Sequence, residues 1–247
     1  MAWKLLRQEA RAAKPGLPPG KRIYAVGDVH GRADLLALLF TRIDEDLKAR
    51  PIADAVEVFL GDYIDRGPNS RHVIDLLIAR EHTHDVVPLM GNHEACALHF
   101  LVDPSALPDW MNIGGLSTVL SYGVTPTRVN DIQSQHEVAD ALGRSIPDSH
   151  RGFLARLPLS FACGDFFFVH AGVRPGVPLQ QQSQHDLLWI RSDFLLHEEN
   201  FGKIVVHGHT PAHEPDVRPN RINIDTGAYA TGRLTCLVLE GSQMSFL

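Results

Sequence analysis

The sequence predicts a protein of the α/β (α+β) class, in which two sheets are separated along the chain by a helical insertion. Three observations support this class. Short apolar runs rich in β-branched and aromatic residues recur along the chain, and each stops at a cluster of Gly, Asp, Asn or His. In the first hundred residues these runs alternate with helical patterns. Between about 103 and 158 the pattern changes to helical, turn-rich sequence.

The first part of the chain is expected to form three strands, each followed by a helix. The strand runs lie at 23–26, 56–60 and 86–90. After the first run, leucine and isoleucine recur at near-helical spacing from Leu35 to Leu47, and Asp34 stands where a first-turn acid favours the helix dipole. Shorter helical patterns follow Ser70 and His93. This alternation is typical of a parallel sheet.

Residues 159–247 return to short strands, with runs at 166–169, 204–206 and 222–224 and less helix between them. We expect an antiparallel-rich second sheet there, and we interpret the insertion at about 103–158 as a helical cap over the strand ends. A chain of 247 residues with 44% apolar composition can bury one large core. We therefore expect a basic arm at 1–21 and a single domain at 22–247 that contains the cap.

Charge excludes some classes of partner. The formal net charge is −6 although residues 1–22 are basic, and phosphate-backbone binding needs a basic surface, so no nucleic-acid partner is expected. Residues 1–14 form either a basic amphipathic helix that docks on a membrane or partner, or a solvated arm. The Pro- and Gly-rich break at 15–20 favours the arm.

The compartment is predicted from what the sequence lacks and from its cysteines. No run approaches the ~18 apolar residues of a membrane span, and the N-terminus lacks the apolar stretch of a secretory signal. Cys96, Cys163 and Cys236 are odd in number and widely spaced, which is typical of a reducing compartment. We therefore expect a cytoplasmic protein without a membrane span.

The clusters that end the apolar runs carry the chemistry. In α/β proteins ligands bind in loops beyond the carboxyl ends of the strands, so these clusters are expected to meet in space. They read Gly27-Asp28-Val29-His30-Gly31, Gly61-Asp62-Tyr63-Ile64-Asp65-Arg66-Gly67, Gly91-Asn92-His93-Glu94, His170-Ala171-Gly172, His207-Gly208-His209-Thr210 and Asp225-Thr226-Gly227.

These side chains predict a site for two divalent metal ions. Asp28 and His30 are two residues apart just past a strand, so in an extended backbone both point toward one ion. Asp62 adds a carboxylate, which can bridge two cations. Nitrogen and oxygen ligands without sulfur suit Mn, Fe, Zn, Co or Ni, and we expect Mn²⁺. The second ion would be completed by Asn92, His170 and one histidine of the cluster at 207–210.

The choice between the last two histidines depends on the turn between them. His207 and His209 lie on the same face by strand alternation, which does not separate them. Gly208 lets the chain bend sharply just before His209 and places it in the loop where the other ligands gather. We therefore predict His209 as the metal ligand and a core position for His207.

The remaining polar residues are predicted to act on the substrate. His93 follows Asn92 in a tight turn and can serve as the proton donor, with Asp65 holding its other ring nitrogen. Arg66 and Arg191 are candidate phosphate clamps, because a guanidinium offers forked donors that match phosphate oxygens. The alternative for Arg191 is a surface salt bridge.

Together these residues resemble the phosphoprotein phosphatase branch of the calcineurin-like metallophosphoesterases, in particular the compact bacterial and phage Ser/Thr phosphatases. The branch pattern GDxHG, GDxxDRG, GNHE, HAG and GHT is matched in order from about residue 22 to 240, and the WxR element falls on Trp189 to Arg191. The resemblance implies a four-layer αββα sandwich of two mixed sheets with a helical cap insertion. It also implies direct attack of a metal-bridging hydroxide on phosphorus, without a phosphoenzyme.

Two comparisons within the wider family refine this expectation. Pro211 stands where many metallophosphoesterases outside the branch carry a second histidine that binds the first metal. The related symmetrical dinucleoside tetraphosphate hydrolases typically lack the aspartate of GDxxDRG and carry GNHD. Asp65 and Glu94 therefore favour a phosphatase over such a hydrolase.

The predicted function is that of a metal-dependent phosphomonoesterase that acts on phosphoserine or phosphothreonine in proteins and phosphopeptides. Dinucleoside polyphosphates are the second candidate substrate and small phosphoesters the third. An alternative from another class is a metal-binding regulatory module that keeps the fold without turnover. The presence of Asp65, His93 and both arginines argues against that alternative.

Overall fold

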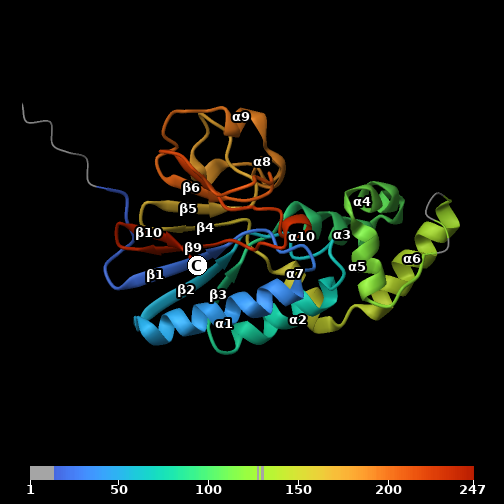
Figure 1. Ribbon diagram of the computed structural model, residues 1–247. Helices are drawn as coiled ribbons and strands as arrows, with labels where there is room; N and C mark the ends of the chain where they lie inside the picture. Colours follow the sequence, from blue (N-terminus) through green and yellow to red (C-terminus); the bar gives the residue numbers. More distant parts are fainter. Residues whose placement is uncertain (1–13, 127, 129–130) are drawn as a thin grey trace, which may run out of the picture.

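The computed structural model describes residues 14–126, 128 and 131–247, and it contains two stacked five-stranded sheets (Figure 1). The two interpretations of the N-terminal arm concern residues that lie almost entirely outside this range. Strands β1, β2 and β3 of the first sheet are parallel, and β9 is antiparallel to both β1 and β10. The spatial order is β10 (Gln243–Phe246), β9 (Cys236–Glu240), β1 (Lys21–Val26), β2 (Asp54–Phe59) and β3 (Asp85–Pro88).

The second sheet is also mixed. Its inner strands β5, β6 and β8 are parallel, and only the outer strands β4 and β7 run antiparallel to their neighbours. The expectation of an antiparallel-rich sheet is therefore wrong for its centre. Long connections follow β5 and β6, so the chain can cross over and return in the same direction. The spatial order is β4 (Ser160–Cys163), β5 (Phe166–Val169), β6 (Ile204–His207), β8 (Arg221–Asn223) and β7 (Asp216–Val217).

Side-chain alternation along the strands produces the layers. On β1, Ile23 and Ala25 join the apolar core between the two sheets, whereas Tyr24 and Val26 join the core under the helices α1 (Ala33–Ala49) and α2 (Ser70–Glu81). The outer face of the second sheet packs against α8 (Gln184–Trp189) and α9 (Ser192–Leu195). Figure 1 shows the resulting order of helix, sheet, sheet, helix. The four-layer αββα sandwich of two mixed sheets is thus confirmed.

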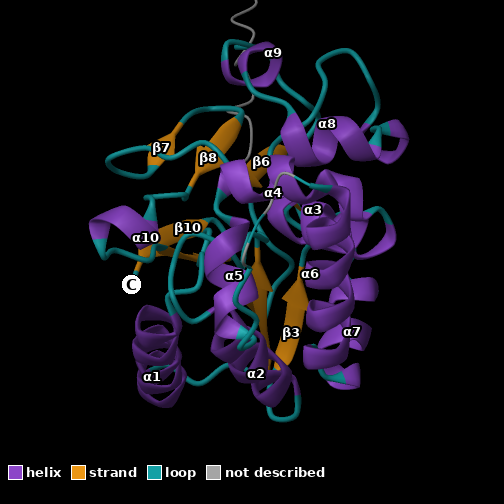
Figure 2. Ribbon diagram, turned by 90° about the vertical axis from the view of Figure 1, so that its right-hand side faces the viewer, coloured by secondary structure: helices purple, strands orange, loops and turns teal. Residues whose placement is uncertain are grey.

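A group of helices follows β3 and lies at one end of the sheets, where β1, β2 and β3 have their carboxyl ends (Figures 1 and 2). The short helix α10 (Ala228–Thr231) lies at the same end. The helices occupy much of the segment predicted as a cap, while the division of the chain into domains stays a prediction. They are α3 (Asn92–Val102), the 3₁₀ turn Pro104–Ala106, α4 (Leu107–Ile113), α5 (Gly115–Ser121), α6 (Ile132–Ser145) and α7 (Asp148–Ala155).

The chain before β1 is already attached to the two sheets. Leu17 is buried in the core between them, and its backbone N–H donates to the carbonyl of Gly241 at 2.9 Å. The N–H of Gly16 donates to the carboxylate of Asp165 at 2.9 Å. Among the described residues, no helix combines the length and apolar character needed to cross a membrane.

Candidate metal centre

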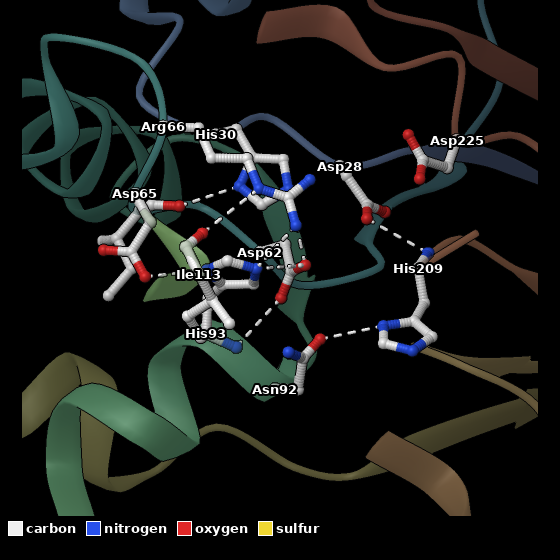
Figure 3. Close-up of polar contacts among 12 residues, drawn as sticks. Asp28, His30, Asp62, Asp65, Arg66, Asn92, His93, Ile113, His209 and Asp225 are labelled. Carbon is white, nitrogen blue, oxygen red and sulfur yellow. Dashed lines mark hydrogen bonds and ion pairs between the residues drawn. The ribbon is translucent and has the colours of Figure 1, made fainter. Parts of the chain in front are cut away.

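The predicted clusters, which follow β1, β2, β3, β5, β6 and β8, converge in one place, and Figure 3 shows residues of five of them side by side. The backbone is also strained at this site. A positive φ at a non-glycine residue is uncommon and costs free energy. Within the described residues, every such position is a predicted site residue. They are His30 at 45°, Asp62 at 53°, Asp65 at 71°, Arg66 at 65° and His209 at 65°. The turn at His30 also means that the extended backbone assumed between Asp28 and His30 is not present.

The first group that can hold a metal ion consists of His30, Asp62 and His93, whose ligand atoms all lie within 4.8 Å of one another. Nδ1 of His30 donates to the carbonyl of Ile64 at 2.9 Å, which leaves Nε2 directed at Asp62, 3.5 Å away. Burial lowers the pKa of His30 to about 3, so the ring is neutral and its free lone pair can bind a cation.

The second group contains Asp62, His170 and His209 within the same mutual distance. Nδ1 of His170 donates to the carbonyl of Leu60 at 2.9 Å, so Nε2 presents a lone pair to Oδ1 of Asn92 at 2.8 Å. Nδ1 of His209 lies 2.9 Å from the same Asn92 oxygen. Burial lowers the pKa of His170, and it lowers that of His209 to about 3. A cation beside Asn92 would satisfy two acceptors that otherwise face one another, Nε2 of His170 and Oδ1 of Asn92.

Asp62 belongs to both groups, which is the position a bridging carboxylate requires. Burial opposes its ionised form, but the surrounding histidines His170, His93 and His30 hold the pKa of this carboxyl well below its usual range. Asp62 is therefore ionised and available to two cations.

Asp28 lies beside these groups, although it is not within the mutual distances that define them. Its Oδ2 accepts a hydrogen bond from the backbone N–H of His209 at 3.0 Å. Its Oδ1 is buried and has no hydrogen-bond partner among the described residues. Burial, together with the carboxylates of Asp225 and Asp62, raises the pKa of Asp28. An unpartnered buried carboxylate oxygen of this kind fits a metal ligand.

The sixth cluster places a further carboxylate here, for which the sequence suggested no role. Asp225 accepts a hydrogen bond from the N–H of Gly227 at 2.9 Å and lies beside Asp28 (Figure 3). Burial, together with the Asp62 carboxylate, raises the pKa of Asp225 to about 6. A cation near Asp28 would lower the cost of keeping several carboxylates in this space.

His93 is held as a proton donor requires, and it also belongs to the first group of possible ligands. Its Nδ1 lies 2.7 Å from Oδ2 of Asp65, and its Nε2 lies 3.2 Å from Nη2 of Arg66. Burial opposes protonation of His93, but the carboxylates of Asp62 and Asp65 raise its pKa above the usual value. The raised pKa favours a role in proton transfer for His93 over metal binding.

The two arginines lie at the two ends of the site. Arg66 contacts His93, and its guanidinium lies over the ring of Tyr229, 4.8 Å from the ring centre. Nε of Arg191 lies 3.1 Å from Nε2 of His209. Both guanidinium groups are exposed, and neither forms an ion pair with a carboxylate in the described part of the chain. The alternative role of Arg191, a surface salt bridge, therefore has no carboxylate partner among the described residues.

Glu94, whose motif was used above to separate substrate classes, lies behind the loop that carries Asp62. It is fully buried and accepts hydrogen bonds from four backbone N–H groups at 2.7–3.2 Å. These donors belong to Asp62, Tyr63, Ile64 and Gly91, so Glu94 joins the loop that carries Asp62 to the start of α3. It therefore supports the loop of the site from the buried side.

Other contributors were not identified from the sequence. Trp110 and Thr118 donate hydrogen bonds to Asp65 from the helical segment after α3. Trp189 and Tyr229 are 37% and 40% exposed, and their rings contact His209 and His30, respectively. Trp189 belongs to the WxR element, and that motif could have identified it from the sequence.

Comparison with known proteins agrees with this geometry. The family model for calcineurin-like phosphoesterases matches residues 21–236. The asymmetrical bis(5'-nucleosyl)-tetraphosphatase PrpE of Anoxybacillus flavithermus is 25% identical over 231 residues, covering 86% of this chain and 88% of the relative. Serine/threonine-protein phosphatase BSL2 of Arabidopsis thaliana is 40% identical over 81 residues, covering 32% of this chain and 8% of the relative.

A solved structure provisionally described as a diadenosine tetraphosphatase superposes with a TM-score of 0.65 at 20% identity, covering 95% of this chain and 97% of the other. This likeness in fold covers nearly the whole chain. The family model spans the clusters from Asp28 to Asp225, and the structure brings those clusters together around two groups of metal-binding atoms. The chain therefore belongs to the calcineurin-like phosphoesterase family, as a metallophosphoesterase.

Proposed function

We propose that this metallophosphoesterase is a phosphomonoesterase that acts on phosphoserine and phosphothreonine in proteins. The observation that supports this proposal is the buried Asp65–His93 pair next to Asp62 and His30. An alkyl alkoxide is a poor leaving group and needs a proton as the ester bond breaks, whereas a polyphosphate leaves without one. A rigidly held proton donor is therefore most useful for an alkyl phosphate ester.

Two divalent ions are proposed to bind the residues that converge at the site. Ions bound there would lower the pKa of water and neutralise phosphate charge. The ligand atoms are nitrogen and oxygen, which supports Mn²⁺, with Fe, Zn, Co or Ni as alternatives. His30 and Asp28 would hold the first ion, Asp62 both, and the second would be completed by Asn92, His170 and His209.

The chain's own residues then bind the phosphate and move the proton. Arg66 lies next to His93 and Arg191 next to His209, so the two guanidinium groups can hold a phosphate from both ends of the site. Nε2 of His93 faces the site beside Arg66 and can give its proton to the leaving oxygen. Asp65 keeps Nδ1 protonated and fixes the ring. No step requires a covalent nucleophile.

The test compares leaving groups in the wild type and in His93→Ala. With a phosphoserine peptide, kcat should fall by ~10²–10⁴, the usual contribution of a positioned acid. With p-nitrophenyl phosphate the loss should be much smaller, because nitrophenolate needs little protonation. Metal content should stay at the wild-type value. An equal loss with both substrates, or loss of metal, would show that His93 is not the proton donor.

The second candidate is hydrolysis of dinucleoside polyphosphates. It is favoured by the tetraphosphatase relative that aligns over most of the chain, and by Trp189 and Tyr229 at the two ends of the site, where exposed rings could stack nucleobases. In that case Trp189→Ala would lower kcat/KM for dinucleoside tetraphosphate by about tenfold or more. The same variant would leave p-nitrophenyl phosphate turnover near the wild-type value.

We also propose a cytoplasmic location and no nucleic-acid partner. All three cysteines are free thiols, which supports a reducing compartment. A net charge of −6 supports the absence of nucleic-acid binding. Small phosphoesters remain a third substrate class, and a regulatory module without turnover remains the alternative that any robust phosphate release would exclude.

A further inference from the structure

We propose that Trp110 and Thr118 are positioning residues that hold the Asp65–His93 pair in the geometry needed for proton donation. They lie on α4 and α5, in the helical segment between β3 and β4, far along the chain from the loop that carries Asp65. This inference rests on the proposed general-acid role of His93.

The carboxylate of Asp65 is fixed from three directions. Its Oδ2 accepts hydrogen bonds from Nδ1 of His93 at 2.7 Å and from Nε1 of Trp110 at 2.8 Å. Its Oδ1 accepts from the hydroxyl of Thr118 at 2.5 Å. Since Asp65 is fully buried, water does not provide substitute donors. Loss of either helix donor would therefore free the carboxylate to rotate away from His93.

Thr118 also holds the backbone of the loop. Asp65 and Arg66 have φ values of 71° and 65°, a conformation that side-chain-bearing residues adopt only under constraint. The backbone N–H of Asp65 donates to the Thr118 hydroxyl at 2.8 Å, and the N–H of Arg66 donates to the carbonyl of Gly114 at 3.2 Å. Thr118 on α5 thus supports Asp65, and Gly114 between α4 and α5 supports Arg66.

Trp110 is itself held in place, as a positioning residue must be. The ring is 1% exposed and packs against Phe100, with ring centres 5.2 Å apart. Gly115 leaves room for it, because a Cβ atom there would lie 2.6 Å from the indole ring. The indole N–H donates to the Asp65 carboxylate, its acceptor among the described residues.

A purely structural role would give the same contacts, so the test must separate proton donation from folding. Trp110→Phe keeps an aromatic ring and removes the N–H, while Thr118→Val keeps the shape and removes the hydroxyl. Thr118→Ser is the matched control, because it keeps the hydroxyl. Each Mn²⁺-loaded variant is assayed with a phosphoserine peptide and with p-nitrophenyl phosphate, and its metal content and Tm are measured.

We expect Trp110→Phe and Thr118→Val to lower kcat for the phosphoserine peptide by about ten- to a hundredfold, because misplacing a catalytic group by about 1 Å can cost about a hundredfold. The loss with p-nitrophenyl phosphate should be several times smaller. Thr118→Ser should retain most of the wild-type activity, and metal content should be unchanged in all three variants.

Equal losses with the two substrates, in proportion to a lowered Tm, would overturn the positioning role. Wild-type activity in both Trp110→Phe and Thr118→Val would overturn it as well. His93→Ala separates this failure from failure of the proposed function. If His93→Ala shows no dependence on the leaving group, the general acid itself is wrong. If His93→Ala shows it and the two helix variants do not, only the positioning role is wrong.

Discussion

Two neighbouring histidines of one motif are expected to respond in opposite ways to substitution. His209 lies within 4.8 Å of the ligand atoms of Asp62 and His170, so His209→Ala should remove a ligand of the second ion. His207 is buried on β6 with its ring 4.9 Å from that of Phe194, and its Nε2 has no described partner. His207→Ala should therefore keep both ions and affect stability.

The size of the stability effect follows from the surroundings of His207. Removing a buried ring that packs against Phe194 costs roughly 3–4 kcal/mol, as for other large-to-small changes in a core. The same change removes an unpartnered buried nitrogen, which returns roughly 1–2 kcal/mol. The net destabilisation is about 2 kcal/mol, and for a chain of this length that corresponds to a Tm lower by about 4–8 °C.

Elemental analysis, Tm and turnover of p-nitrophenyl phosphate are measured on both purified variants. His209→Ala should retain about half of the wild-type metal and almost no turnover, since a dinuclear site needs both ions. His207→Ala should retain the full metal content, with moderately changed activity and the lower Tm. Metal loss in the His207 variant, together with retention in the His209 variant, would refute the assignment.

Three further predictions concern phosphate binding by Arg191, the close contact between Gly208 and Asp28, and the stability of the metal-free protein. Arg191→Lys should weaken inhibition by inorganic phosphate about tenfold at unchanged metal content, because an ammonium lacks the forked donors; unchanged inhibition would contradict a clamp. Gly208→Ala should lose metal, since its Cβ would lie 2.0 Å from Oδ1 of Asp28, whereas Gly143→Ala meets no atom within 4 Å and serves as the control. The folded-state pKa of His30, about 3, is below its ordinary value of 6.5, so the unfolded chain binds the proton first as pH falls. Metal-free protein should therefore lose stability below pH ~6.5, by up to ~1.4 kcal/mol per pH unit for this group, in urea titrations; constant stability would place His30 in solvent.

The strands and the ligand clusters were predictable because their signals are local. Apolar runs that stop at Gly, Asp, Asn or His correspond to strands in the structure, and the loops after them meet at one end of the sheets. Strand direction in the second sheet was not predictable in this way. It depends on where long connections return the chain, which the short runs at 166–169, 204–206 and 222–224 do not encode.

The supporting residues were hidden for a related reason. Trp110 and Thr118 stand in a helical segment whose sequence carries no catalytic motif, and their contact with Asp65 exists only once α4 and α5 pack against the loop. Glu94 shows the opposite case. Its motif was noticed and used to separate substrate classes. In the structure Glu94 is buried against four backbone N–H groups, so its role is to hold the loop in shape.

The central proposal is that the site hydrolyses alkyl phosphate monoesters with His93 as the acid. It is tested most directly by measuring kcat/KM for a phosphoserine or phosphothreonine peptide and for dinucleoside tetraphosphate on one Mn²⁺-loaded preparation. The proposal predicts a value for the phosphopeptide at least about tenfold higher, with strong dependence on His93, since only that substrate needs a proton on its leaving oxygen. A higher value for dinucleoside tetraphosphate, retained in His93→Ala, would contradict it.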